Sequence, residues 1–218
     1  TLRVLPVASM AKNTGFLPIS GGRLLVNASV GATDRSGYSL HLVDSSGQII
    51  RSFDDDNRND ATSSPADQRV IAPASEGGMW VGHRDRPRFG RWSEEGKRLS
   101  DIVLPWHTFA GDANLQHDAN GSRNNETRID GLVEDPSGLL LVLFERPKGE
   151  RARENTGGRS ERPGAEGRLP SPSEKEERTE SWLVIVDPKR GTVIGRTRLP
   201  GLFIWALPGG LFVRIAED

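Results

Sequence analysis

The sequence of 218 residues contains no cysteine, a single tyrosine and only 6% aromatic residues, and its charges almost cancel. The absence of cysteine excludes disulfide bonds and any chemistry that needs a thiolate. Because 29 Lys and Arg stand against 30 Asp and Glu, the formal net charge is −1. Such a chain has no overall field that attracts nucleic acid or anionic lipid. No apolar run reaches the roughly 18–20 residues of a membrane-spanning helix, so we predict no transmembrane segment.

The motifs of several enzyme classes are also missing. The chain has no nucleophile elbow, phosphate-binding loop, dinucleotide fingerprint or metalloprotease helix. Gly21-Gly22 and Gly77-Gly78 precede apolar strands rather than helices, so they lack the helix N-terminus that binds phosphate. No window carries a sustained apolar stripe of helical period. The sequence therefore predicts strands and no cofactor, and it leaves the biochemical activity open.

What the chain does contain is one short phrase, a glycine turn followed by an apolar strand, that recurs four times. The copies are Gly21-Gly22-Arg23-Leu24-Leu25-Val26, Gly77-Gly78-Met79-Trp80-Val81, Ser137-Gly138-Leu139-Leu140-Leu141-Val142 and Gly209-Gly210-Leu211-Phe212-Val213. Repetition at this spacing is typical of repeat architectures. Together with the many glycine turns between short strands, it predicts a β-propeller.

Each phrase opens a longer unit that continues with a hairpin. In the first unit the hairpin spans residues 38–53, and its polar turn ends at Gly47. Three units therefore hold about four strands each, whereas the fourth holds two before the chain stops. We predict an all-β fold of four-stranded antiparallel blades, with residues 1–218 forming one partial propeller domain of about three and a half blades. Because a blade without its outer pair exposes strand edges, we expect the chain to be a fragment or its ring to close with other strands.

A long polar insert interrupts the third unit. From residue 148 to residue 181 the sequence is dominated by Gly, Pro, Ser, Arg and Glu, with acids and bases in balance. Such a segment buries too little apolar surface to repay its loss of conformational entropy. We predict a disordered loop projecting from one face of the propeller. Two interpretations stay open, a solvated spacer and a segment that folds on contact with a partner.

Two stretches of the sequence resemble the bacterial six-bladed β-propellers of the NHL-like or TolB-like type. They are residues 42–53 and residues 131–140, which contain Asp44-Ser45-Ser46-Gly47 and Asp135-Pro136-Ser137-Gly138. A blade of that family typically reads as an Asp-x-x-Gly hairpin followed by the phrase Asp-Pro-x-Gly-x-Leu-Trp-Val. The likeness covers nearly the whole chain except the inserts. This sequence departs from the pattern at the tryptophan position, which only Trp80 fills.

The resemblance implies a fold more than an activity, because related propellers include sugar-lactone hydrolases, lyases and protein-binding modules. Six blades would need more chain than is present. Propellers of this type are often exported or lipid-anchored, so the resemblance implies a periplasmic, extracellular or lipid-anchored location. The chain begins at Thr1 rather than Met, and we expect a leader or further sequence to precede it.

A lactonase-type propeller would hold a divalent cation, Ca²⁺ or Mg²⁺, with oxygen ligands from several blades. Ligands of this kind are expected just before or within the strands that follow the glycine turns. The candidates are Asp130 and Glu134, with Asn27 from the first unit. The alternative for Glu134, with Asp135 and Pro136 after it, is a turn or cap.

A second group of residues is a candidate for ligand binding. It consists of His83, Arg84, Trp106 and His107. His83 or His107 would act as an acid or base only with a carboxylate or substrate-positioning partner, and Trp106 is placed to stack on a sugar. The other interpretation is an ordinary polar surface for the histidines and Arg84, and packing between adjacent blades for Trp106. His41 alternates with Leu40 and Leu42, so we expect it to be exposed.

Because no catalytic set converges at the inner positions of the blades, we expect a non-enzymatic binding or scaffold module. Its partner would be a protein, a peptide or a carbohydrate, and not a nucleic acid. The alternative is a metal-dependent hydrolase of the sugar-lactone class. A purely structural repeat protein is not separable from a binding module by sequence.

Overall fold

The computed structural model describes residues 15–27, 38–54, 69–105, 107, 127–148, 179–201, 203–207 and 211–214. Fourteen strands and one short 3-10 turn, Ser20–Gly22, are the elements of these residues. The predicted all-β fold is confirmed. The insert predicted at residues 148–181 falls mostly outside the described residues.

The strands form three four-stranded sheets and one pair, and all neighbouring strands are antiparallel. The first sheet contains β1 (Phe16–Ile19), β2 (Arg23–Asn27), β3 (Leu40–Val43) and β4 (Ile49–Phe53). The second contains β5 (Arg69–Pro73), β6 (Met79–His83), β7 (Arg88–Trp92) and β8 (Arg98–Val103). The third contains β9 (Arg128–Glu134), β10 (Leu140–Pro147), β11 (Thr179–Asp187) and β12 (Thr192–Arg198). The remaining pair is β13 (Phe203–Leu207) with β14 (Leu211–Arg214).

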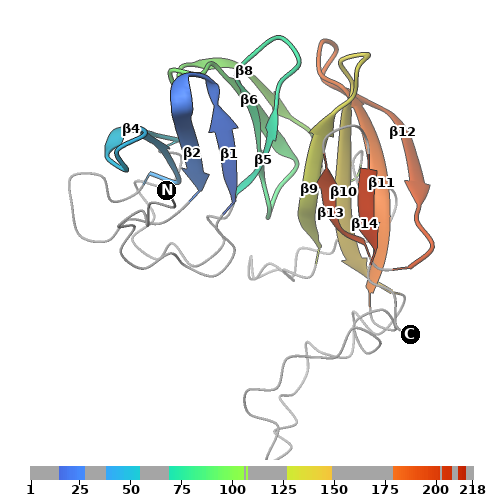
Figure 1. Ribbon diagram of the computed structural model, residues 1–218. Coiled ribbons are helices and arrows are strands. Elements are labelled where there is room, and N and C mark those ends of the chain that lie inside the picture. The colour runs from blue at the N-terminus through green and yellow to red at the C-terminus, as the bar shows by residue number, and fades with distance from the viewer. Residues whose placement is uncertain are drawn as a thin grey trace, which may run out of the picture.

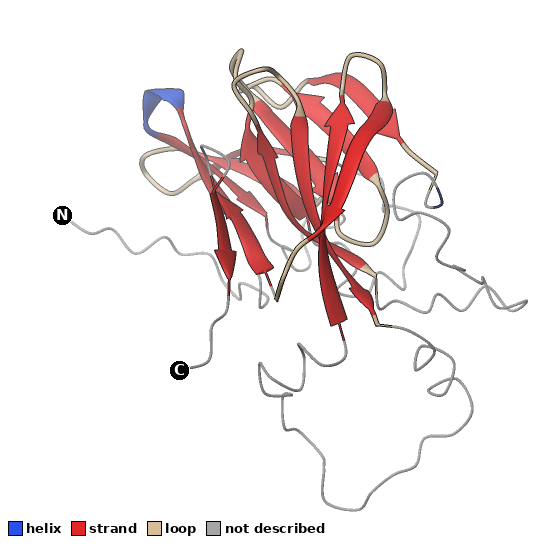
Figure 2. Ribbon diagram, turned by 90° about the vertical axis from the view of Figure 1, so that its right-hand side faces the viewer, coloured by secondary structure: helices blue, strands red, loops and turns tan. Residues whose placement is uncertain are grey.

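The three large sheets pack side by side like propeller blades (Figure 1, Figure 2). Within each sheet the strands lie in sequence order, and the first strands contact one another from sheet to sheet, β1 with β5, β5 with β9 and β9 with β13. The recurring glycine phrase forms the second strand of each sheet. The sequence units were counted from the glycine turn. Each sheet begins one strand before that turn, because the short strand that precedes the turn is its first strand.

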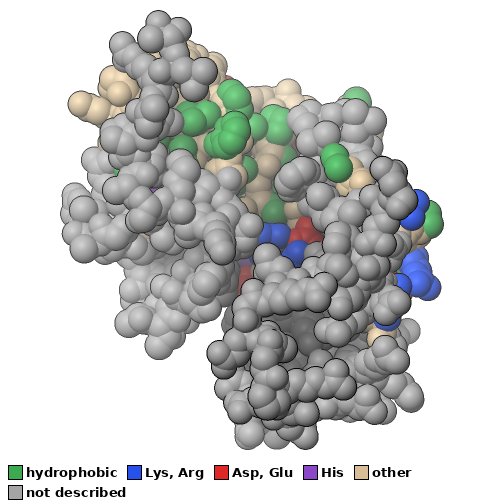
Figure 3. Space-filling view, turned by 60° about the horizontal axis from the view of Figure 1, so that its bottom comes forward, with side chains coloured by type: hydrophobic (Ala, Val, Ile, Leu, Met, Phe, Trp, Pro, Cys, Tyr) green, Lys and Arg blue, Asp and Glu red, His purple; other side chains and the backbone are tan. Residues whose placement is uncertain are grey.

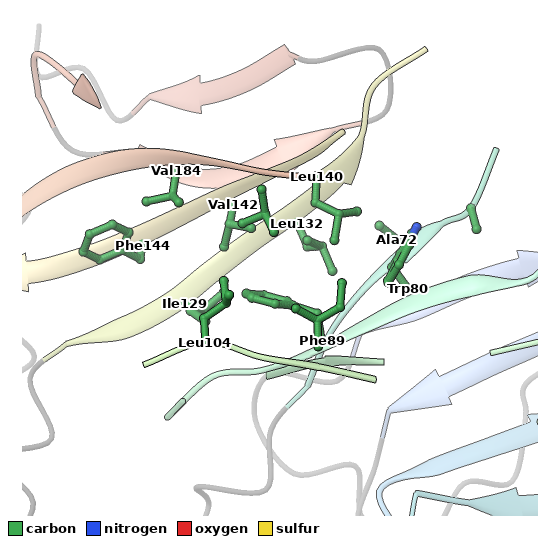
Figure 4. Packing of buried hydrophobic residues seen from close by; sticks show 13 residues of the cluster. Ala72, Trp80, Phe89, Leu104, Ile129, Leu132, Leu140, Val142, Phe144 and Val184 are labelled. Atoms are coloured by element: carbon green, nitrogen blue, oxygen red, sulfur yellow. The ribbon is translucent and has the colours of Figure 1, made fainter. Parts of the chain in front are cut away.

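Two apolar layers hold the sheets together. The larger lies between the second and third sheets, where Trp80, Phe89 and Leu104 meet Ile129 and other side chains of the third sheet (Figure 4). The smaller lies between the first and second sheets and includes the tilted ring pair Phe53–Trp92, with centroids 5.1 Å apart. Trp80 and Trp92 thus fill the space between blades, as expected for aromatic residues that recur along a propeller.

The ends of the strands define two faces. The turn face, at the top of Figure 1, carries the tight turns at 20–22, 44–48, 74–78, 93–97, 135–139 and 188–191. The loop face is the opposite one, where the even-numbered strands end and the longer connections of the sequence leave. The glycines of the repeat belong to the turn face, and Gly78 shows why: its φ is +79°, and a Cβ would overlap the carbonyl oxygen of Trp92.

Candidate functional site

The acidic residues of the turn face serve the turns themselves. Asp135 Oδ1 accepts hydrogen bonds from the backbone N–H of Ser137 at 2.8 Å and of Leu139 at 2.9 Å. Asp44 does the same for its own turn. The bond from the Ser137 hydroxyl, with these backbone donors, holds the pKa of Asp135 below its usual range despite some desolvation. These carboxylates are local turn caps.

Glu134 also lies at the turn face, where it joins two sheets. Its Oε2 accepts hydrogen bonds from the backbone N–H of Ser75 at 2.7 Å and from Trp80 Nε1 at 2.9 Å. Its Oε1 accepts the Ser75 hydroxyl at 2.8 Å. Both oxygens of this predicted metal ligand are therefore engaged with the second sheet.

Asp130 occupies an irregular position near the start of β9. Leu143 of β10 lies opposite Gly131, but the next residue, Phe144, lies opposite Ile129, so Asp130 is the extra residue of a β-bulge. Bulges of this kind redirect a side chain and are common beside functional sites. Ile129 packs in the core shared with the second sheet, and Asp130 contacts Arg84 beyond the end of β6. Two consecutive residues thus face the same neighbour, which a regular strand would not allow.

Asp130 is the centre of a charged group that we call the Asp130 cluster, formed by Arg84, Arg128, Asp130 and Glu145. Asp130 Oδ1 pairs with the Arg84 guanidinium and with Arg128 Nε at 2.9 Å, and Arg128 reaches Glu145 Oε2 at 3.4 Å. Arg84 Nε also donates to the carbonyl of Ile129 at 3.1 Å. Acidic and basic side chains are visible near the centre of the loop face (Figure 3).

The second carboxylate oxygen of Asp130 differs from the first. Asp130 Oδ2 is buried and has no hydrogen-bond partner among the described residues. The side chain of Arg128, in contrast, is 45% exposed. A buried acceptor with an unused lone pair is costly unless something pairs with it. The cluster therefore combines an unused acceptor with a cation that solvent can reach.

His83 lies beside this cluster at the end of β6 and is buried. Its Nδ1 accepts a hydrogen bond from Arg86 Nε at 3.1 Å, so the neutral ring carries its proton on Nε2. Desolvation, followed by the charges of Arg69, Arg86, Arg88 and Arg98, lowers the pKa of His83 to about 2. The ring is therefore neutral at physiological pH, and the partner that the structure gives its Nδ1 is a guanidinium.

Asn27 lies on the loop face one sheet away. Its Nδ2 donates to the carbonyl of Arg69 at 2.8 Å and so joins the first sheet to the second. Arg69 Nε in turn forms a buried ion pair with Asp54 Oδ2 at 2.6 Å. Asp54 adopts φ +66° directly after β4, which places its side chain against β5. Nothing in the local sequence distinguishes Asp54 from the acidic residues that follow it.

The structure brings together only some of the predicted residues. Asp130 and Arg84 are in contact, whereas Glu134 lies at the opposite face, about 13 Å from Asp130 along an extended strand. In the described part of the chain, no group of three or more His, Cys, Asp or Glu is arranged to hold a metal ion. Metal binding by Asp130, Glu134 and Asn27 stays a prediction.

The remaining residues named in the sequence analysis are His107, Trp106 and His41. His107 is exposed, and Trp106 lies outside the described residues. The expected exposure of His41 is wrong: the residue is 1% exposed, and its Nδ1 is 2.8 Å from Ser52 Oγ. It pairs across strands with Val26 on the far side of the first sheet, which is also buried. The described residues include no helix long and apolar enough to cross a membrane.

Comparison with known proteins adds little to this geometry. No protein-family profile matches the sequence, and no curated protein matches it. Among solved structures, the chain is similar to a protein of unknown function from Bacteroides caccae, with 11% identity and a TM-score of 0.38. The alignment covers 82% of this chain and 41% of that protein, so this chain spans less than half of its length.

Proposed function

We propose that this chain is a non-enzymatic binding or scaffold module whose ligand docks on the loop face, over the Asp130 cluster. The same proposal assigns it to the six-bladed propellers of the NHL-like or TolB-like type, with about three and a half blades present. A location outside the cytoplasm follows from that assignment alone.

The observation that carries the proposal is the unused oxygen of Asp130. A bulge directs this carboxylate toward the second sheet, two arginines pair with one oxygen, and the other oxygen has no partner among the described residues. A ligand that donates a hydrogen bond there would relieve the cost of the unpaired acceptor. The exposed side of Arg128 favours an acidic group beside that donor. Acidic oligosaccharides and acidic peptides have this chemistry.

Calorimetric titration of the full chain with oligogalacturonate, with an aspartate-rich peptide and with neutral maltohexaose tests the proposal. We expect an acidic probe to bind and the neutral sugar to bind weakly or not at all. Arg128→Gln should weaken binding roughly tenfold or more, since it removes a charged hydrogen bond. Arg190→Gln, which changes a 79% exposed arginine of the turn face, should leave binding unchanged.

The hydrolase alternative has its own measurement. Thermal melting with Ca²⁺ or Mg²⁺, and with a chelator as control, detects binding to the native state as a rise in Tm. A rise that Asp130→Asn abolishes would support the hydrolase and count against a metal-independent binding module. Acidic probes that bind wild type and Arg128→Gln equally well would show that the ligand docks elsewhere.

A further inference from the structure

The third sheet ends in an open strand edge. Its strand order is β12-β11-β10-β9, so β12 has a strand neighbour on one side only within the described part of the chain. The strand lies at the right-hand edge of the molecule in Figure 1. An edge of this kind can pair with an extended peptide through backbone hydrogen bonds.

The pairing with β11 determines which backbone groups of β12 point outward. Leu199, directly after β12, donates its N–H to the Ser181 carbonyl at 2.9 Å, and the register with β11 is regular from residue 195 to residue 198. Residues along an antiparallel strand direct their hydrogen-bonding groups alternately to the two sides. Because residue 199 faces β11, Arg196 and Arg198 direct their N–H and C=O groups to the open edge.

The charge of this edge differs from that of the other two outer strands. β12 contains Arg196 and Arg198 and no acidic residue. On β8, in contrast, Arg98 pairs with Asp101 of the same strand at 2.6 Å, and β4 carries a single cation, Arg51. Of the three outer strands, β12 is therefore the most basic.

The two arginines of β12 differ in their partners. Arg198 Nε pairs with Glu180 of β11 at 3.0 Å, and the Arg198 side chain is still 58% exposed. Arg196 is exposed and makes no hydrogen bond or ion pair with a described residue. Since Glu180 also pairs with Arg146, its carboxylate does not balance the charge of the edge. Lys and Arg side chains are visible along the right-hand side of the molecule in Figure 3, the side on which β12 lies.

A β-bulge divides β12 and exposes an apolar side chain. Val193 and Gly195 lie opposite consecutive residues of β11, so Ile194 is the extra residue of the bulge, and it is 52% exposed. Ile50 and Leu99 occupy the same bulge position on β4 and β8. An exposed apolar residue is thus common to the three outer strands, and the charge beside it distinguishes β12. The bulge also confines regular pairing to the half of β12 near the loop face, where the two arginines lie.

We propose that the edge of β12 binds an acidic peptide in an extended conformation, as a fifth strand of the third sheet. The peptide backbone pairs with the outward N–H and C=O groups of Arg196 and Arg198, and its carboxylates lie beside the two guanidiniums. Ile194 supplies an apolar contact at one end. Two basic edges repel each other, so the same charge disfavours pairing with a second copy of this chain. The inference does not depend on the function proposed for the Asp130 cluster.

Calorimetric titration of the full chain with a capped peptide of alternating Glu and Val, at physiological ionic strength, tests this inference. We expect the peptide to bind, and Arg196→Gln should weaken binding roughly tenfold or more. Methylation of alternate backbone nitrogens of the peptide should abolish binding, because it removes the strand hydrogen bonds and keeps the charges. Raising the ionic strength should weaken binding of the unmodified peptide, since the arginines are exposed.

Arg190→Gln is the matched control, because it removes the same charge from the turn before β12 and should leave binding unchanged. Thr192, at the start of β12, is already about 13 Å from Arg196 along an extended strand, which exceeds the Debye length of roughly 8 Å.

Three results would overturn the inference: no binding of the acidic peptide to the folded wild type, equal binding by Arg196→Gln, or equal binding of the N-methylated peptide. A concentration-dependent dimer in which β12 is protected from hydrogen exchange would make a second copy the occupant and would also overturn it. Loss of peptide binding in Arg128→Gln but not in Arg196→Gln would place the peptide at the Asp130 cluster, which would overturn this inference while supporting the proposed function.

Discussion

The two faces of the sheets use acidic residues in opposite ways. On the turn face, Asp44 and Asp135 are only partly buried and bond to backbone groups two to four residues away. On the loop face, Asp54 and Asp130 are buried and pair with arginines 15 and 46 residues away. These aspartates of the turn face therefore make local contacts, whereas those of the loop face pair with another sheet. Glu134 is the exception on the turn face, because it joins the third sheet to the second.

This difference determines how much each face contributes to the stability of the fold. A local turn cap adds little more than one net hydrogen bond to the stability of the fold, and similar caps occur in several turns. A buried ion pair removes both charges from water, so loss of one partner leaves an uncompensated charge. We expect the loop face to be sensitive to substitution and the turn face to be tolerant, and three experiments compare them.

The largest effect is expected for Asp54→Asn. The substitution keeps the size and tolerance for positive φ of residue 54 but leaves Arg69 buried without its carboxylate. We expect the free energy of unfolding to fall by about 3–5 kcal/mol, as measured by urea denaturation. Asp187→Asn is the matched change on the turn face and should cost about 1 kcal/mol or less. Equal losses in the two variants would remove the distinction between the faces.

The next effect is the response of the loop face to pH. The pKa of His83 is lowered to about 2 in the folded chain, against 6.5 for an ordinary histidine, so the unfolded chain binds a proton first as the pH falls. Stability should therefore decrease below pH 6.5, by about 2 kcal/mol between pH 7 and pH 5. Denaturation curves of wild type and His83→Gln across this range measure the contribution. An identical pH dependence in both proteins would contradict a neutral, buried His83.

The smallest effect is expected for Asp135→Ala, which removes one turn cap. The loss should be about 1 kcal/mol at pH 7, and Asp135→Asn, which keeps an acceptor oxygen, should lose less. Because the folded pKa of Asp135 lies below 3.8, its contribution is present above that pH and disappears as the pH falls through the folded pKa. Denaturation between pH 5 and pH 2 should show a shallower acid decline for Asp135→Asn than for wild type. A loss as large as that of Asp54→Asn would show that the turns are not independent local units.

The turn face was largely predictable from sequence. Gly22, Gly78 and Gly138 all adopt positive φ at the turn before the second strand, which is the backbone requirement that makes the glycine recur. Asp44 and Asp187 occupy equivalent turns between the third and fourth strands of their sheets, and a glycine of positive φ, Gly47 or Gly191, ends each turn. Such features depend on residues within one turn, so the local sequence contains them.

The loop face was predictable only in part. Asp130 and Arg84 were each candidates, but nothing in their sequence indicated that they pair with each other. The bulge at Asp130 is a one-residue shift in the register between β9 and β10. Such a shift leaves no recognisable pattern in the sequence of either strand. On the turn face, the role of Glu134 was equally hidden, because its partner Trp80 is 54 residues away and belongs to another sheet. Partners of this kind are fixed by how the sheets pack.

The bulge on β9 also has a consequence for the history of this chain. Deleting the one extra residue would restore regular pairing between β9 and β10, because Gly131 and Ile129 already lie opposite consecutive residues of β10. Such a deletion would remove the carboxylate and leave the apolar core of the strand intact. The cluster can therefore be gained or lost by a single-codon insertion or deletion, and a one-residue gap after Ile129 would mark a relative that keeps the fold without the Asp130 cluster.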